Sequence, residues 1–269
     1  MHYIIRYFCI SHIGKHRRKN QDNYICGQQY KCKCDVDPYD LISGIIETEK
    51  PIITGIFDGM GGEQCGETAS LIAAQTAFEA DLSGNIIDCL NEYCRISNRK
   101  ICSYADEHGI FSMGTTAAML VFARKEIGLC NIGDTRIYRY SDDLLEQISV
   151  DHYAVSYSGN KPPLSQNLGI PESEFIIDPY VAKGNYNKGD IYLICSDGLT
   201  DMVSNKNIER IIKENNFEDT AMKLLQAALD GGGRDNITII ICRVERKNKT
   251  LIDRILGNKS TEQEFSYGK

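Results

Sequence analysis

The stretch that decides the fold is P51-I-I-T-G-I-F-D-G-M-G-G-E-Q-C-G66. An apolar run of this length that ends at a carboxylate predicts a buried strand, which delivers Asp58 to the edge of a sheet. Four of the eight positions after Asp58 carry no side chain: Gly59, Gly61, Gly62 and Gly66. A turn needs one or two glycines, so either this corner is flexible or something approaches the backbone closely here.

Patterning along the rest of the chain predicts an α+β fold. Strands are expected at residues 3–9, 23–29, 51–57, 117–123, 127–132, 136–140, 144–149, 174–182, 191–195 and 236–244, and helices at 64–80, 86–106, 207–215 and 217–229. The four runs between residues 117 and 149 are expected to form an antiparallel meander. This order differs from the strict alternation of a doubly wound sheet, and it predicts antiparallel sheets packed together with helices on their outer faces.

Composition limits the domain organisation and the partners. The 269 residues are 42% hydrophobic and contain no tract typical of a linker, which predicts one domain at 1–246 and a short polar tail at 247–269. A net charge of −7 argues against a nucleic-acid partner. No apolar run approaches the roughly 20 residues that span a bilayer, so no membrane partner is expected.

The cysteines and the N-terminus indicate a reducing compartment. The first ten residues are interrupted by Arg6 and lack a cleavage site typical of export signals, so we expect a cytoplasmic protein whose eleven cysteines are thiols. Cys26, Cys32 and Cys34 have the spacing C-x5-C-x-C, which raises the alternative of a zinc site. A fourth ligand at suitable spacing is missing, and this argues against zinc.

Aspartates recur where the predicted strands begin or end. Each alone is typical of a turn. As a set, all-oxygen ligands without His or Cys favour Mn²⁺ or Mg²⁺, and a carboxylate shared by two ions about 3.5–4 Å apart is the usual geometry for phosphate ester hydrolysis. The five are Asp22 in the N-terminal loop, Asp58 and Asp197 after strands, Asp134 between two strands, and Asp235 before the last.

Several motifs occur in the order found in one known family. They are G14-x-x-R-x-x-N-Q-D22, F57-D-G-M-G-G62, S112-M-G-T-T-A117, I132-G-D-T-R136, C195-S-D-G-L-T-D-M-V-S204 and G232-G-R-D-N-I-T238. Together they resemble the bacterial form of the metal-dependent Ser/Thr protein phosphatases of type 2C, the PPM family, over residues 11 to 245. The resemblance implies a β-sandwich of two antiparallel sheets flanked by helices on both sides, with metal ions in a cleft at one end.

The resemblance also implies roles for individual residues. Arg17 would hold the substrate phosphate, a task that suits the guanidinium fork. The implied metal ligands are Asp58, which bridges two ions, the Gly59 carbonyl, Asp197 and Asp235, with Asp22 in an outer shell and Asp134 joining Asp197 at a third ion. Two positions depart from the family. Gln21 replaces an acidic residue, and Met60 replaces the histidine that animal members carry as a proposed general acid.

The function implied is hydrolysis of phosphoserine and phosphothreonine on proteins, by in-line attack of a water or hydroxide that bridges two Mn²⁺ or Mg²⁺ ions. The expected partners are phosphoproteins and a cognate Ser/Thr kinase or its substrates, and the protein is expected to be a monomer. One alternative is a non-catalytic phosphoprotein-binding regulator of the same fold. Another is a metal-dependent hydrolase of nucleotides or nucleic acid, which the negative charge disfavours.

Overall fold

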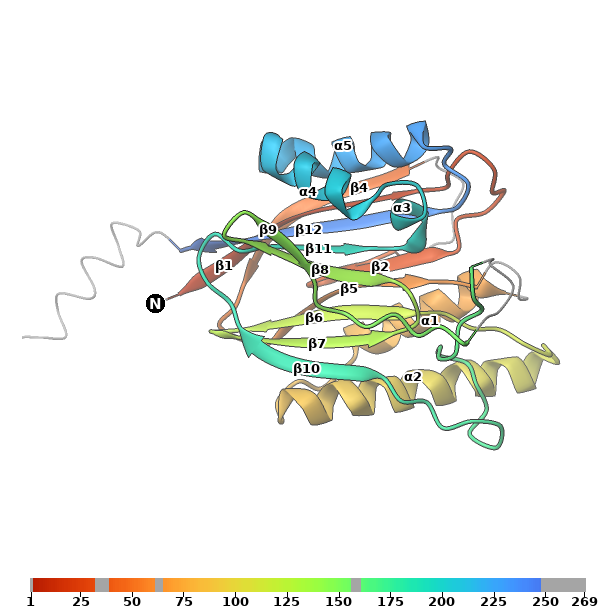
Figure 1. Cartoon of the computed structure of the whole chain (residues 1–269). Coiled ribbons are helices and arrows are strands. Elements are labelled where there is room, and N and C mark those ends of the chain that lie inside the picture. The colour runs from red at the N-terminus through yellow and green to blue at the C-terminus, as the bar shows by residue number, and fades with distance from the viewer. Residues whose placement is uncertain (1, 32–38, 61–64, 156–160, 248–269) are drawn as a thin grey trace, which may run out of the picture.

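Two stacked antiparallel sheets form the centre of the molecule in this computed structural model, which describes residues 2–31, 39–60, 65–155 and 161–247 (Figure 1). Sheet A has the order β4(Tyr39–Glu47), β1(Tyr3–His12), β12(Ile237–Arg246), β11(Ile191–Cys195), β8(Arg136–Ser141), β9(Leu144–Gln147). Sheet B has the order β10(Tyr180–Asn185), β7(Glu126–Ile132), β6(Ala117–Ala123), β5(Ile52–Asp58), β2(Asp22–Cys26), β3(Gln29–Tyr30).

Helices cover the outer face of each sheet, which makes four layers (Figure 1). α1(Gly66–Phe78) and α2(Ile86–His108) pack on sheet B, whereas α4(Asn205–Glu214), α5(Phe217–Asp230) and the short α3(Asp197–Thr200) lie on the side of sheet A. The fold class predicted from the sequence is confirmed. No helix in the described part of the chain has the length and apolar character needed to cross a membrane.

The layering explains why the central strands are almost uniformly apolar. An antiparallel strand with one wet face alternates apolar and polar residues, but a strand covered on both faces need not. β12 begins with six consecutive buried residues, and β5 is buried from Ile53 to Phe57. Between the sheets, the rings of Phe122 and Tyr192 make an edge-to-face contact with centroids 5.7 Å apart. The apolar face of each strand is therefore fixed against a specific layer.

Both sheets contribute chain ends to one edge of the sandwich. β5 ends at Asp58 and pairs there with the first residue of β2, Asp22. From sheet A, β11 ends just before Asp197, and β12 begins just after Asp235. The chain crosses from sheet B to sheet A between β7 and β8, at the turn that carries Asp134. This edge therefore gathers all five aspartates singled out in the sequence.

Three local predictions were wrong. The runs between residues 117 and 149 do not form a meander, because β6 and β7 belong to sheet B while β8 and β9 belong to sheet A. The strand expected at 174–182 begins only at Tyr180. β4 was missed because its exposed alternating residues lack a continuous apolar run. Of the suggested zinc ligands, Cys26 is buried in β2, and Cys32 and Cys34 lie outside the described residues.

Packing between the sheets predicts a large effect of truncation at Ile240. Its side chain is 0% exposed in the core between the sheets, so Ile240→Ala should lower the free energy of unfolding by about 2–5 kcal/mol in urea denaturation. Ile45 on β4 is 52% exposed, and Ile45→Ala should change it by less than about 0.5 kcal/mol. Equal losses in the two variants would contradict this description of the core.

Candidate metal centre

Asp58 is held by its main chain at the end of β5. Its amide donates to Thr116 Oγ1 at 3.0 Å, and its carbonyl accepts from the Thr116 amide and from Thr115 Oγ1, both at 2.9 Å. Asp22 lies directly opposite on β2. The backbone of Asp58 is fully bonded, and its carboxylate projects from a rigid strand end.

Gly59 lies where the chain packs against itself. A Cβ at this position would lie 2.3 Å from the Gly66 carbonyl oxygen and 2.7 Å from the Gln21 carbonyl oxygen. The amide of Gly59 also donates to Gln21 at 3.2 Å. The glycine is therefore required by close backbone approach, which is one of the two readings that the sequence left open.

Asp22 is buried beneath this corner. Its Oδ2 accepts from Ser196 Oγ at 2.9 Å and from Thr238 Oγ1 at 2.7 Å, and both donors come from sheet A segments. Its Oδ1 is buried and makes no hydrogen bond within the described residues. Burial raises the pKa of Asp22, although the two hydroxyls act in the opposite direction. An orphaned buried carboxylate oxygen of this kind requires a proton or a cation.

Arg17 pairs with Asp235 at one flank of the site. Arg17 Nη2 lies 2.6 Å from Asp235 Oδ2. Asn236 next to it fastens the N-terminal loop, because its side-chain amide donates at 2.9 Å to the carbonyl oxygens of Ile13 and Lys19. The loop that carries Arg17 is thus tied to the start of β12.

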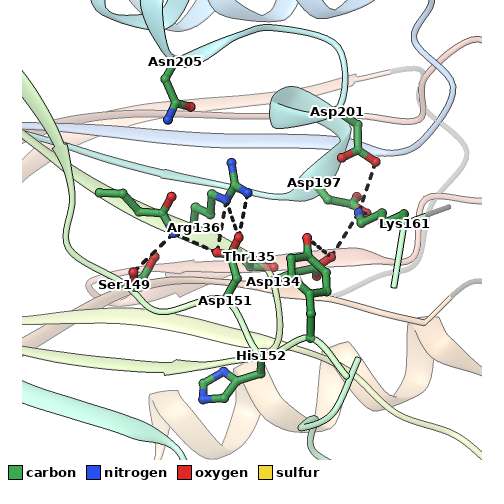
Figure 2. Close-up of polar contacts among 12 residues, drawn as sticks. Asp134, Thr135, Arg136, Ser149, Asp151, His152, Lys161, Asp197, Asp201 and Asn205 are labelled. Atoms are coloured by element: carbon green, nitrogen blue, oxygen red, sulfur yellow. Dashed lines mark hydrogen bonds and ion pairs between the residues drawn. The ribbon is translucent and has the colours of Figure 1, made fainter. Parts of the chain in front are cut away.

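Lys161 occupies the opposite flank, where Figure 2 shows it between three aspartates. Its Nζ lies 2.5 Å from Asp197 Oδ2, 3.0 Å from Asp134 Oδ2 and 3.1 Å from Asp201 Oδ2. The Tyr153 hydroxyl also donates to Asp134 at 3.2 Å. The structure thus brings Asp134 and Asp197 together, with an ammonium group between them.

A polar network positions the turn that carries Asp134 (Figure 2). Arg136 binds Asp151 through two nitrogens, with Nη2 to Oδ2 at 2.6 Å and Nε to Oδ2 at 2.9 Å. The amide of His152 donates to the Gly133 carbonyl at 3.0 Å. The turn between the sheets is therefore held from both sides, and His152 serves it through its backbone and its Nδ1.

Electrostatics at the centre of the site favour a bound cation. Burial, and then the charges of Asp22, Asp197, Asp134 and Asp235, raise the pKa of Asp58 well above its usual range. Burial and Asp134 raise the pKa of Asp197 to about 7, against the opposing charge of Lys161. In the described ranges, no hydrogen bond or ion pair reaches the Asp58 carboxylate, so the most repelled carboxylate is also the one without a compensating partner.

The donor set fits a hard divalent ion that retains water. Among the residues the structure describes, no group of three or more His, Cys, Asp or Glu residues is placed so that it could hold a metal ion without other ligands. Mg²⁺ and ions like it need only one or two carboxylates, and water fills the remaining positions. The Asp58 carboxylate and the unpartnered Oδ1 of Asp22 satisfy that requirement.

Sequence reasoning missed the residues that support these aspartates. Thr116, Ser196 and Thr238 all lie inside the quoted motifs. Their position in these motifs could have indicated that they support the site. Asp201 also lies in a motif, five residues after Ser196. Lys161 does not, and only its place in the fold reveals it.

Comparisons with known proteins give a consistent result, although no protein-family model matches the chain. The serine/threonine protein phosphatase PstP of Mycobacterium tuberculosis is 32% identical over 206 residues, which are 71% of this chain and 40% of that protein. The serine/threonine phosphatase stp of Listeria innocua is 30% identical over 227 residues, which are 76% of this chain and 88% of that protein. The chain thus spans less than half of the mycobacterial relative and most of the listerial one.

Solved structures agree with the sequence relatives. The crystal structure of the Mycobacterium tuberculosis phosphatase PstP/Ppp superposes with a TM-score of 0.75 at 26% identity, covering 90% of this chain and 100% of that one. The PstP catalytic domain in complex with two manganese ions gives a TM-score of 0.72 at 27% identity, covering 90% and 99%. Two manganese ions are therefore bound by a protein of this fold and similar sequence.

The raised pKa of Asp58 predicts that Asp58→Asn stabilises the metal-free protein at high pH. The unfolded chain ionises this group above about pH 4, whereas burial and the neighbouring aspartates make the folded chain hold the proton to higher pH, so the folding free energy contributed by Asp58 becomes less favourable as pH rises. Asparagine removes that penalty. Thermal melting in EDTA should show a higher Tm for Asp58→Asn at pH 8, and the difference should shrink toward pH 5.

Excess Mn²⁺ provides the matched control for this experiment. It should raise the Tm of the parent protein more than that of Asp58→Asn, because an ion bound only by the folded state stabilises it. A lower Tm for Asp58→Asn than for the parent at pH 8 in EDTA would show that Asp58 is not a source of repulsion.

Proposed function

The chain belongs to the PPM family of serine/threonine protein phosphatases, and on that premise we propose that it hydrolyses phosphoserine and phosphothreonine monoesters on proteins with Mn²⁺ or Mg²⁺. The observation that carries this proposal is the Asp58 carboxylate. Four other aspartates surround it, burial and their charges raise its pKa well above the usual range, and within the described residues no side chain forms a hydrogen bond or ion pair with it. A non-catalytic regulator would have no need to keep such a costly group.

Four groups would hold two divalent ions: the carboxylates of Asp58, Asp197 and Asp235 and the carbonyl of Gly59. Asp22 lies behind Asp58, where its orphaned Oδ1 can accept from a water bound to an ion. Gln21 sits beside Asp22 without a charge, so the outer shell is less negative than an acidic residue there would make it.

Two divalent ions bound here would supply the nucleophile by lowering the pKa of a bound water, and they would withdraw charge from the phosphoryl oxygens. The chain itself positions the substrate. Arg17 stands at the mouth of the site on a loop tied to β12, and its guanidinium can meet two phosphate oxygens at once. Its partner here is Asp235. Asp235 is also one of the residues that would hold an ion, and Arg17 would then be free to bind the incoming phosphate.

Side chains near the site argue against a covalent intermediate. Ser196 donates its hydroxyl to Asp22 and accepts from the Thr238 amide, so it is engaged on both sides. Burial raises the pKa of the Cys195 thiol to about 12, which leaves it protonated at neutral pH. Water activated by the ions is therefore the nucleophile in this proposal. The Met60 side chain has no acidic proton, so the leaving alkoxide takes its proton from solvent or from another group.

The partners follow from the substrate. Phosphoproteins are the substrates, and a Ser/Thr kinase of the same cell is the natural source of them. The acidic surface does not oppose phosphate binding, because bound divalent ions and Arg17 reverse the local field at the site. The protein is proposed to act as a cytoplasmic monomer.

Metal dependence is the primary test. Phosphate release from a phosphothreonine peptide should require Mn²⁺ or Mg²⁺, stop in EDTA, and return when Mn²⁺ is restored. Asp197→Asn should lower kcat by at least on the order of 10²-fold, since a bound cation supplies several kcal/mol of transition-state stabilisation. Full activity in EDTA, or undiminished activity of Asp197→Asn, would exclude the two-ion site.

Arg17 has a separate test with a neighbouring control. Arg17→Ala should lower kcat/KM for a phosphopeptide by on the order of 10²-fold, because one donor to the developing phosphoryl charge is lost. Arg18→Ala should match the parent, since Arg18 is exposed and lies outside the site. Manganese affinity measured by calorimetry should remain unchanged or rise in Arg17→Ala, and a loss of affinity would assign Arg17 a structural role instead.

A further inference from the structure

Three carboxylates surround the ammonium group of Lys161, much as carboxylates surround a bound metal ion. One ammonium nitrogen lies within 3.1 Å of carboxylate oxygens from Asp134, Asp197 and Asp201, which come from two separate segments (Figure 2). Its side chain is 38% exposed, whereas that of Asp134 is only 7% exposed. The ammonium therefore reaches inward from the surface to a largely buried carboxylate.

Backbone pairing around Lys161 holds its ammonium group next to Asp134. Tyr153 and Leu164 form a β-bridge, and the amide of Ala154 donates to the Pro163 carbonyl at 2.9 Å. The Tyr153 hydroxyl and the Lys161 ammonium both reach Asp134 Oδ2. Pro162 and Pro163 follow Lys161 directly and fix two backbone φ angles.

The two halves of the carboxylate cluster are therefore neutralised differently. Asp134, Asp197 and Asp201 share the ammonium of Lys161, and this group of three is called the outer site from here on. Asp58 at the centre has no such partner among the described residues.

We propose that Lys161 is a built-in cation of the outer site, so that the chain takes two divalent ions around Asp58 and admits a third at Asp134 and Asp197 only when Lys161 withdraws. The inference rests on the proposed two-ion site and specifies how that site is regulated. An ammonium and a divalent ion cannot share these oxygens, because a Mg²⁺-type ion needs them at about 2.0–2.1 Å. The two cations compete, and their competition is reciprocal.

The first test counts ions. The full chain, stripped with EDTA, is titrated with Mn²⁺ by calorimetry, and free Mn²⁺ is followed by electron paramagnetic resonance. The parent should bind two ions, and a third much more weakly. Lys161→Met should bind the third about 5- to 150-fold more tightly, the usual range for one coupled pair of sites. Lys188→Met, at an exposed position of the loop before β11, should behave as the parent.

A double variant locates the gained ion. Lys161→Met with Asp134→Asn should lose the tighter third ion and keep the first two. An unchanged or lower affinity for the third ion in Lys161→Met would overturn the proposal, because Lys161 would then have no effect on binding of the third ion or would favour it. If the parent failed to bind the first two ions at all, the proposed function itself would fail, so the two failures are distinguishable.

A second measurement needs no variant and no phosphatase activity. An amine-reactive acetylating reagent with mass spectrometry reports the reactivity of each lysine in the parent chain. Lys161 should be acetylated more slowly than Lys188 in EDTA, and its rate should rise only at Mn²⁺ concentrations above those that fill two sites. Equal rates for the two lysines in EDTA, or a Lys161 rate that stays constant up to saturating Mn²⁺, would overturn the proposal.

Discussion

Repulsion between Asp58 and the carboxylates around it is the interaction on which the rest of the site depends. The β2–β5 register sets Asp22 directly opposite Asp58, and burial removes the water that would otherwise screen the two charges. Hydroxyls from Ser196 and Thr238 stabilise only one oxygen of Asp22. The folded chain therefore carries an unfavourable charge density that a divalent cation converts into binding energy.

The sandwich makes this arrangement possible because its two sheets end at the same edge. A single antiparallel sheet with one solvated face would expose such carboxylates to water and leave each with an ordinary pKa. Here Asp22 and Asp58 come from sheet B, while Asp197 and Asp235 adjoin strands of sheet A. Hydrogen bonds from Ser196 and Thr238 to Asp22 join the two sheets at that edge. The carboxylate cluster and the packing of the sheets are thus parts of one structure.

Much of this could be predicted from the sequence, and the failures have physical causes. β5 and β12 were predictable because burial on both faces leaves an uninterrupted apolar run. β4 was not, since it is an edge strand with alternating exposed residues. The change from sheet B to sheet A at Gly133 cannot be predicted from the local sequence, because a hairpin and a change of sheet use similar turn residues. Lys161 could not be found either, since its partners are distant in sequence and a lone lysine in a loop has no periodic signal.

The contrast between the inner and outer carboxylates follows from what each cation can do. A lysine ammonium carries one charge and has no open coordination position, so it can relieve repulsion but cannot activate water. It can therefore replace an ion only where the ion's charge, and not its chemistry, is required. Around Asp58, no side chain in the described residues takes that role. At Asp134 and at Oδ2 of Asp197, the tethered ammonium of Lys161 already supplies a positive charge, and it requires no third ion to be drawn from solution. In the proposed two-ion site, metal ions would thus be needed around Asp58, where no described side chain can supply their chemistry.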